Sequence, residues 1–137
     1  MNKELKAIQT SCDHDTYYAT EALCMALCYH LYEEYAGPDR DPLWEETTVA
    51  LVGVGIMAIA YLKQEELSVQ KINEMIAKDA PIQKDGSVPM DKVAYMLPES
   101  SELRGKYQVA RYTDSKTWHS ALKEAGRILG RHAPLEV

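Results

Sequence analysis

The sequence predicts an all-α fold, a compact bundle of about five helices that forms a single domain over residues 1–137. Apolar residues recur at helical spacing through most of the chain, and residues that cap helices stand where these patterns begin and end. No two segments alternate apolar and polar residues clearly enough to pair as strands. A chain of this length buries about two-thirds of its unfolded surface on folding, so one core without disulfides is sufficient.

The first predicted helix begins after Asp15 or Thr16, either of which can cap it, and ends at Gly37 and Pro38. It is apolar on nearly every side, which is typical of a helix that is central or lies in an interface. Residues 1–14, which precede it, are expected to form an N-terminal arm.

A second helix is predicted from Asp41, as N-cap, and Pro42, at the first helical position, to about Glu66. Its middle, Val49 to Leu62, is rich in β-branched residues and would also suit a buried strand. We expect a helix because the run exceeds ordinary strand length and no turn interrupts it. The run is shorter than the roughly 20 residues of a bilayer span, so we expect protein to bury it.

Two shorter helices are predicted next. Ser68 can cap an amphipathic helix that ends near Asp79, and a further helical pattern starts at Met90 and is closed by Pro98. Between them lies a loop with a turn at an Asp-Gly pair.

The C-terminal part is predicted to contain one long helix. Residues 106–112 fit a short extended segment or an irregular helix, because their alternation has no partner strand. The long helix starts at Asp114 or Ser115 and is expected to end at Gly130, with residues 131–137 as a frayed tail.

The composition is that of an acidic globular protein. The formal net charge is −6 at pH 7, and the charged and apolar fractions predict neither a disordered chain nor a membrane protein. Residues 1–15 hold no apolar stretch of the kind found in a secretory signal. Three cysteines are too few for a disulfide scaffold. We therefore expect a cytoplasmic protein with free thiols and no contact with a membrane.

A cluster of potential zinc ligands lies near the N-terminus. Thiolate and imidazole groups suit zinc, and two of the thiols are four positions apart on one helix face. The alternative is packing, because cysteines on an apolar helix are usually core residues and no ligand pair flanks a tight turn here. We expect no cofactor; the candidate ligands are Cys12, His14, Cys24, Cys28 and His30.

Catalytic motifs are missing from the sequence. It contains no nucleophile elbow, no glycine-rich phosphate loop and no pair of histidines around a glutamate. Pairs of carboxylates recur, but they fall at helix ends and in loops, where acids are normally solvated. A non-enzymatic protein is therefore predicted, with a zinc-binding module or small enzyme as an alternative.

Charge is divided unequally along the chain. Residues 1–103 hold eight Lys and Arg against eighteen Asp and Glu, whereas residues 104–137 hold seven against three. Clustered cations on a helix are typical of phosphate or nucleic-acid contact, although a nucleic-acid-binding domain is more often basic overall. The alternative is a solvated helix that docks on the acidic part. The candidate phosphate contacts are Arg104, Lys106, Arg111, Lys116, Lys123, Arg127 and Arg131.

Aromatic residues suggest an interface. The first two helices have more apolar circumference than a small monomer easily buries, which predicts a homodimer. Tyr and Trp combine apolar area with a polar tip, as protein interfaces often require. The candidate interface residues are Tyr29, Tyr32, Tyr35, Trp44 and Trp118.

These observations predict a helical protein-binding or regulatory protein, whose partners are a second copy and another protein. A nucleic-acid-associated protein that uses the basic C-terminal helix is the alternative. In size and style alone, the chain resembles the short helical proteins carried by bacterial phages and other mobile elements. This resemblance implies a regulator or inhibitor and assigns no role to any residue.

Overall fold

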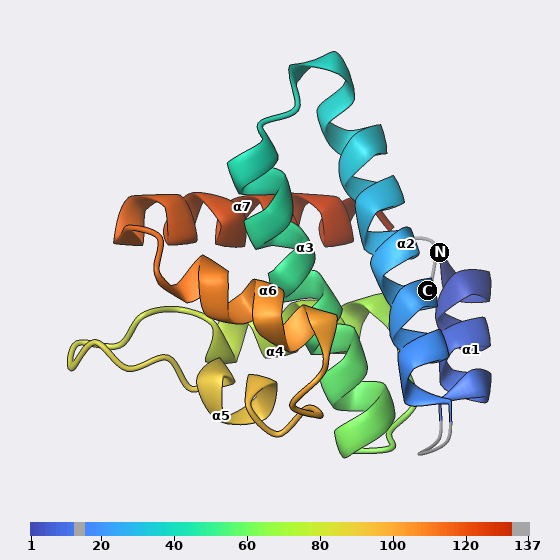
Figure 1. The fold of residues 1–137 in the computed structure, drawn as a ribbon. Helices are drawn as coiled ribbons and strands as arrows, with labels where there is room; N and C mark the ends of the chain where they lie inside the picture. The colour runs from blue at the N-terminus through green and yellow to red at the C-terminus, as the bar shows by residue number, and fades with distance from the viewer. Residues whose placement is uncertain (13–15, 133–137) are drawn as a thin grey trace.

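The computed structural model describes residues 1–12 and 16–132. Within these two ranges the chain forms seven α-helices and no strand (Figure 1), so the all-α prediction is confirmed and the expected number of helices was too low. The helices are α1 (Asn2–Ser11), α2 (Tyr17–Ala36), α3 (Pro42–Met57), α4 (Val69–Asp79), α5 (Met90–Ala94), α6 (Glu102–Arg111) and α7 (Ser115–His132).

Helix α3 is the centre of the fold. Helices α2, α6 and α7 pack against it, and α4 contacts both α3 and α7. Every residue from 47 to 60 is buried. The helix continues as one π-helical turn, Ala58–Leu62, so the apolar run is helical rather than a strand. The chain then turns at Gln64, whose φ is 54°, short of the expected end of this helix.

Gly53 explains how α6 reaches α3. A Cβ atom at this glycine would lie 2.5 Å from Cδ2 of Leu103, a fully buried residue of α6. Glycine is unfavourable inside a helix, and here its missing side chain makes room for a core residue of the neighbouring helix.

The helix from Pro42 to Leu62 is longer than its apolar run. With 21 residues, this helix is long enough and apolar enough to cross a membrane, but 83% of the residues in its most apolar 18-residue stretch are buried inside the protein. Such burial is the pattern of a core helix in a globular domain.

Helix α1 replaces the expected N-terminal arm. Leu5 and Ile8 are almost fully buried, and α1 packs against α2. Among the residues of α1 whose burial is described, only these two are buried, so the apolar periodicity was too short to indicate a helix. Residues 13–15, which include Asp15, one of the two predicted caps of α2, lie outside the described residues.

Helix α6 corrects the expectation of an extended or irregular segment at residues 106–112. The Oγ atom of Ser101 accepts a hydrogen bond from the amide of Arg104 at 3.1 Å and caps the helix. Leu103, Tyr107 and Ala110 all face the core. Their spacing of four and three residues is helical, so the alternation around them was coincidental.

The predicted caps of α3 and α4 are confirmed, whereas the side chain of Thr16, at the N-cap of α2, makes no capping hydrogen bond. Asp41 accepts from the amide of Leu43 at 2.9 Å, and Ser68 accepts from the amide of Lys71 at 3.1 Å. Helix α7 continues past Gly130 to His132, so the first two residues of the expected tail are helical. The remaining residues, 133–137, are outside the described part of the chain.

Candidate functional site

The candidate zinc ligands do not come together among the described residues. Cys24 and Cys28 are buried on α2, whereas His30 is exposed and pairs with Glu34 at 2.7 Å. No three potential ligands in residues 1–12 and 16–132 are grouped so that they could hold an ion. The pKa of Cys24 is raised by its hydrogen bond with Cys28 and by burial, which favours a neutral thiol over a metal-binding thiolate.

The other two candidate ligands are His14 and Cys12. His14 lies outside the described residues. Cys12 follows the last residue of α1 and is half-buried against the core. The Sγ atom of Cys24 donates to the carbonyl of Gly53 at 3.7 Å, so this thiol contacts the α3 backbone in a packed core.

Three of the seven candidate phosphate contacts are held within the protein. Arg104 donates to the carbonyl of Leu97 at 3.1 Å, and the Nζ atom of Lys106 lies 2.8 Å from a carboxylate oxygen of Glu46. The third, Arg111, takes part in a core network. These cations position α6 in the fold.

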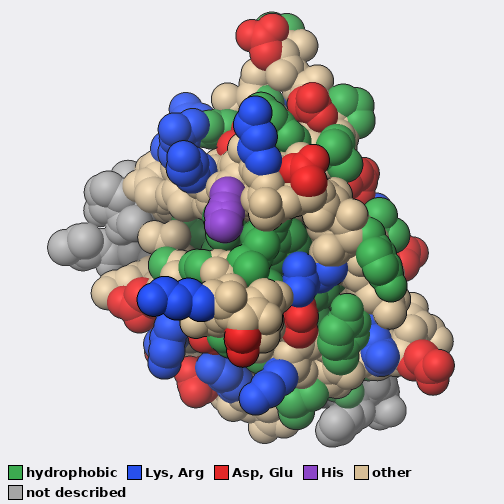
Figure 2. All heavy atoms as spheres, turned by 90° about the vertical axis from the view of Figure 1, so that its left-hand side faces the viewer, with side chains coloured by type: hydrophobic (Ala, Val, Ile, Leu, Met, Phe, Trp, Pro, Cys, Tyr) green, Lys and Arg blue, Asp and Glu red, His purple; other side chains and the backbone are tan. Residues whose placement is uncertain are grey.

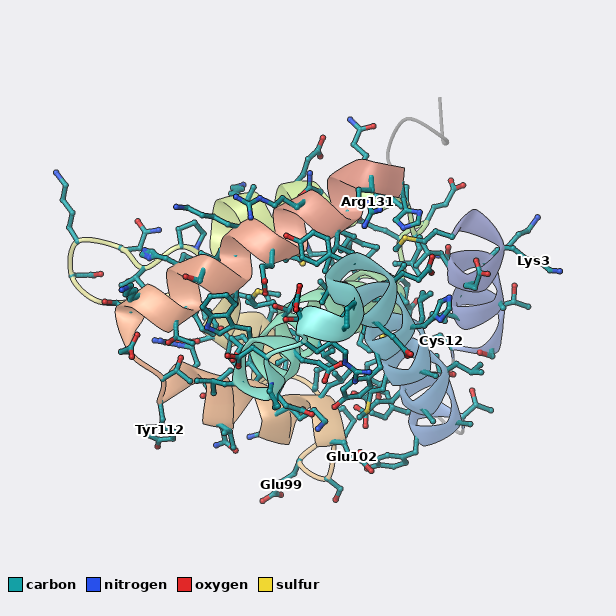
Figure 3. All side chains as sticks on the ribbon, turned by 90° about the horizontal axis from the view of Figure 1, so that it is seen from above. Lys3, Cys12, Glu99, Glu102, Tyr112 and Arg131 are labelled. Atoms are coloured by element: carbon teal, nitrogen blue, oxygen red, sulfur yellow. The ribbon has the colours of Figure 1, made fainter. Side chains whose placement is uncertain are left out.

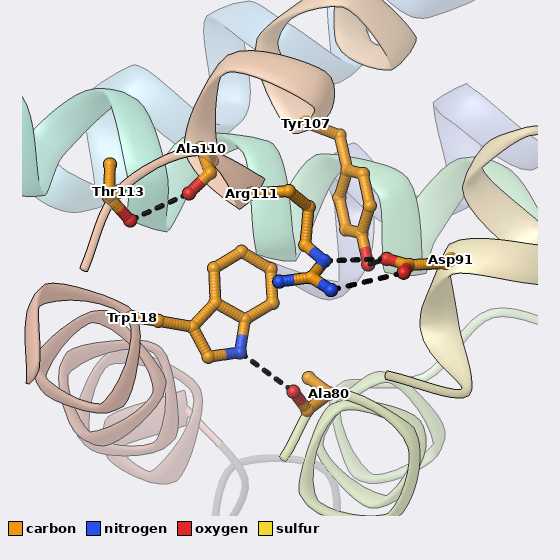
Figure 4. A network of polar contacts seen from close by, with 7 residues as sticks. All are labelled: Ala80, Asp91, Tyr107, Ala110, Arg111, Thr113 and Trp118. Carbon is orange, nitrogen blue, oxygen red and sulfur yellow. Dashed lines mark hydrogen bonds and ion pairs between the residues drawn. The ribbon is translucent and has the colours of Figure 1, made fainter. Parts of the chain in front are cut away.

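This network joins α5, α6, α7 and the end of α4 (Figure 4). Asp91 accepts hydrogen bonds from the hydroxyl of Tyr107 at 2.6 Å and from Nε of Arg111 at 2.8 Å. The Arg111 guanidinium lies 5.3 Å from the ring centre of Trp118, whose Nε1 donates to the carbonyl of Ala80 at 2.8 Å. Arg111 and Trp118 are therefore structural residues.

The other four candidate cations lie on α7. Their spacing places them on one exposed stripe, and within the described ranges none of them forms an ion pair with a carboxylate. They are Lys116, Lys123, Arg127 and Arg131. Figure 2 shows the side of the molecule where α7 begins, on which basic side chains are interspersed with acidic and apolar ones.

The predicted aromatic interface is largely used inside the chain. Tyr32 and Trp118 are buried, and Tyr29 and Tyr35 are half-buried, while 38% of Trp44 is exposed. Burial raises the pKa of Tyr32 to about 12. The single chain already covers α3, so the apolar circumference of that helix no longer argues for a dimer, while Tyr18 and Leu23 of α2 stay at least half exposed.

A different apolar surface lies between the start of α3 and α6. It is a groove of about 270 Å³. Of its lining residues, Leu43 is 50% exposed and Val109 is 70% exposed, and Tyr112, the neighbour in sequence of the lining residue Thr113, is 90% exposed. We define the α3–α6 face as this groove with Tyr112; the groove is lined by Leu43, Glu46, Thr47, Gly105, Lys106, Val109, Ala110 and Thr113.

A polar cluster of Tyr29, Glu46 and Lys106 borders the α3–α6 face. The hydroxyl of Tyr29 donates to Glu46 at 2.8 Å, and Lys106 lies 5.6 Å from the Tyr29 ring centre. Burial disfavours both charges, but the hydrogen bonds of Lys106 and Tyr29 to the carboxylate lower the pKa of Glu46. The same contacts raise the pKa of Lys106. The two charges neutralise each other beside the apolar groove.

Sequence analysis missed the α3–α6 face because it did not identify α6 as a helix. The spacing of Leu103, Tyr107 and Ala110 was the available signal. Had it been used, Val109 and Tyr112 would have fallen outside the core-facing stripe.

A second groove, of about 310 Å³, lies between α1 and α2. Its lining includes Ile8 and Leu27, which are buried, and Leu23, which is half exposed. It has fewer exposed large apolar side chains in its lining than the α3–α6 groove. The α1–α2 groove, although larger, is therefore a weaker candidate for a binding site than the α3–α6 groove.

Sequence analysis also missed the buried carboxylate of Glu21, which is only 3% exposed. It accepts hydrogen bonds from the hydroxyls of Tyr17, at 2.7 Å, and Ser101. It also accepts from the amide of Glu102 at 2.9 Å. The carboxylate thus joins α2 to the N-terminus of α6 and helps to position the α3–α6 face.

Comparison with protein-family models, with curated proteins and with solved structures gave no match for this chain.

Proposed function

We propose that this chain is a non-enzymatic, helical protein-binding domain that docks a polypeptide on the α3–α6 face. The observation that carries the proposal is the exposure of Leu43, Val109 and Tyr112 beside one apolar groove. Exposed apolar side chains that gather around a groove are typical of interaction sites, whereas scattered ones are ordinary.

The chemistry of the face also favours binding. Tyrosine contributes a large contact area and a hydroxyl at little conformational cost, and it is enriched where interfaces hold most of their binding energy. Glu46 and Lys106 are the charged residues of the groove, and each is paired with the other. They give the groove a polar rim that can select a partner, while neither is left to act as an acid or base.

The first prediction tests this face by site-specific photo-crosslinking. A photoreactive amino acid at Tyr112 should capture a polypeptide in cells that produce the protein, because that side chain is the most exposed part of the face. The additional change Val109→Asp should reduce the yield at least tenfold by placing a charge in the apolar contact. Denaturing gels and mass spectrometry measure the yield and identify the captured peptide.

The matched control carries the photoreactive residue at Gln70, an exposed position of α4. Capture of the same polypeptide with equal yield from Gln70 would show nonspecific contact and contradict the proposal. If the photoreactive residue at position 112 captures no polypeptide, the proposed function is contradicted as well.

The stripe on α7 supports a second candidate function, contact with nucleic-acid phosphates. Its cations are exposed, and within the described residues none of them forms an ion pair with a carboxylate, in contrast to Lys106 and Arg111 of α6. Arg131 lies over the ring of Tyr35, 5.9 Å from its centre. Four such contacts would give a slope of about −3.6 when the logarithm of duplex-DNA affinity is plotted against the logarithm of salt concentration.

The second prediction follows from this slope. Replacing Lys123 and Arg127 with Gln should change the slope to about −1.8, because two of the four contacts are lost. Fluorescence anisotropy with a labelled duplex measures both slopes. A matched pair of changes on α4, Lys71→Gln and Lys78→Gln, should leave the slope unaltered. Affinity that does not depend on salt would exclude this function.

A further inference from the structure

We propose that the occupant of the α3–α6 face is a second copy of this chain. The α6 helices of the two copies would pack antiparallel, across a two-fold axis near Tyr107. This inference rests on the proposed function, since it names the partner of the same face. It moves self-association from α2 and α3, the second of which the chain buries by itself, to α6.

The outer side of α6 has the composition of a helix contact. The residues that point away from the core are Glu102, Gly105, Gln108, Val109 and Tyr112, and of these five only Glu102 is charged. Figure 3 shows Tyr112 pointing away from the bundle at one end of α6, with Glu102 at the other end. The centre of this surface is therefore apolar or neutral, and its one outward carboxylate is at an edge.

Gly105 is the least expected residue in this helix. Apart from its chain neighbours and the backbone of its own helix, no described atom lies within 4 Å of the position that its Cβ would occupy. Gly53 differs, because there the side chain of Leu103 fills the space. Packing inside the chain does not require glycine at position 105, and close approach of a helix from outside would.

An antiparallel pair makes this surface complementary to itself. With the axis near residue 107, Gly105 of one copy lies opposite Val109 of the other, and the same contact occurs a second time by symmetry. A projecting side chain thus meets a gap on both sides of the axis. Tyr112 lies opposite Glu102 of the second copy, where its hydroxyl can donate to that carboxylate.

Charge separates this surface from the similar one on α7. Gly126 and Gly130 also have open space where a Cβ would be. However, Lys123 and Arg127 lie on the same side of α7, and a symmetric α7 contact would bring like charges together. Self-pairing through α6 places no like charges opposite each other, so we assign the contact to α6.

The third prediction uses sedimentation velocity on the full chain over a series of concentrations. The unaltered protein should form a dimer in a concentration-dependent manner. Gly105→Leu should raise the dissociation constant at least tenfold, because the new side chain fills the gap that Val109 of the second copy enters. Its thermal midpoint at low concentration should be the same or higher, since the position is empty in the monomer and leucine favours a helix.

The matched control is Gly130→Leu, which makes the same chemical change at another open helical glycine. It should dimerise as the unaltered protein does. A protein that stays monomeric at every concentration would overturn the inference, and so would a Gly105→Leu protein that dimerises normally.

The crosslinking experiment separates this inference from the proposed function. A photoreactive residue at position 112 that captures α6 of a second copy supports both. Capture of a different protein by a monomeric chain overturns the inference and leaves the proposed function in place. A monomer that captures no polypeptide overturns both.

Discussion

Replacing Trp118 with alanine should lower the free energy of unfolding by about 3–5 kcal/mol, the range found when large aromatic residues are removed from cores. Trp118 is 1% exposed and its ring meets Tyr107 edge to face, with ring centres 5.7 Å apart. Its loss would leave a cavity, remove the surface on which Arg111 lies and leave the carbonyl of Ala80 without its indole donor.

Denaturant unfolding followed by far-ultraviolet circular dichroism measures this change without depending on tryptophan fluorescence. The matched control is Trp44→Ala, which removes the same side chain from a position that is 38% exposed. We expect this control to cost about 1 kcal/mol or less. Equal destabilisation by the two substitutions would contradict the assignment of Trp118 to the core and of Trp44 to the surface.

Prediction from the sequence succeeded where the signal is local and failed where it depends on tertiary contacts. Helices with local signals were identified correctly, because a cap such as Asp41 or Ser68 acts on amides only two or three residues away. The long apolar run of α3 was likewise sufficient to predict a buried helix. Placing Trp118 in the core required knowing that α4 packs on α7 and that Tyr107 of α6 lies against the Trp118 ring, and no local pattern contains that information.

Helices α1 and α6 were missed for a related reason. Each is 10 residues long and places only two or three large apolar residues on the core. Such short helices are stable through tertiary packing more than through their own propensity. For α6, the contact between Gly53 and Leu103 joins residues far apart in sequence, so the sequence does not show which helix α6 packs against.

The candidate site was harder to predict than the fold. The sequence supplied seven cations near the C-terminus, but the structure pairs Lys106 with Glu46 and Arg111 with Asp91, which leaves α7 as the exposed stripe. Ion pairs over such separations depend on the fold and have no sequence signature. The α3–α6 face also depends on the fold and has no sequence signature, since Leu43 and Val109 come to line one groove only after both helices have packed on the core.

Glu21→Ala should also destabilise the protein strongly, by about 2–4 kcal/mol, through unsatisfied donors. The substitution removes the acceptor of the Tyr17 hydroxyl, the Ser101 hydroxyl and the Glu102 amide at a site that water hardly reaches. It also removes a negative charge beside the N-terminus of α6, where the helix dipole favours an anion. Because α6 forms half of the α3–α6 face, binding on that face should weaken as well.

Glu21→Gln separates the hydrogen bonds from the charge. The glutamine carbonyl can still accept from the amide of Glu102, and its amide group can donate to the hydroxyls of Tyr17 and Ser101, so we expect a cost of about 1 kcal/mol from the lost charge alone. In Glu21→Ala, hydrogen exchange should show reduced protection of the amides at the start of α6. The amides at the start of α4, which Ser68 caps, should keep their protection. Equal destabilisation by Ala and Gln would mean that charge dominates, and unchanged exchange in α6 would contradict the role of Glu21 as the carboxylate that holds this helix.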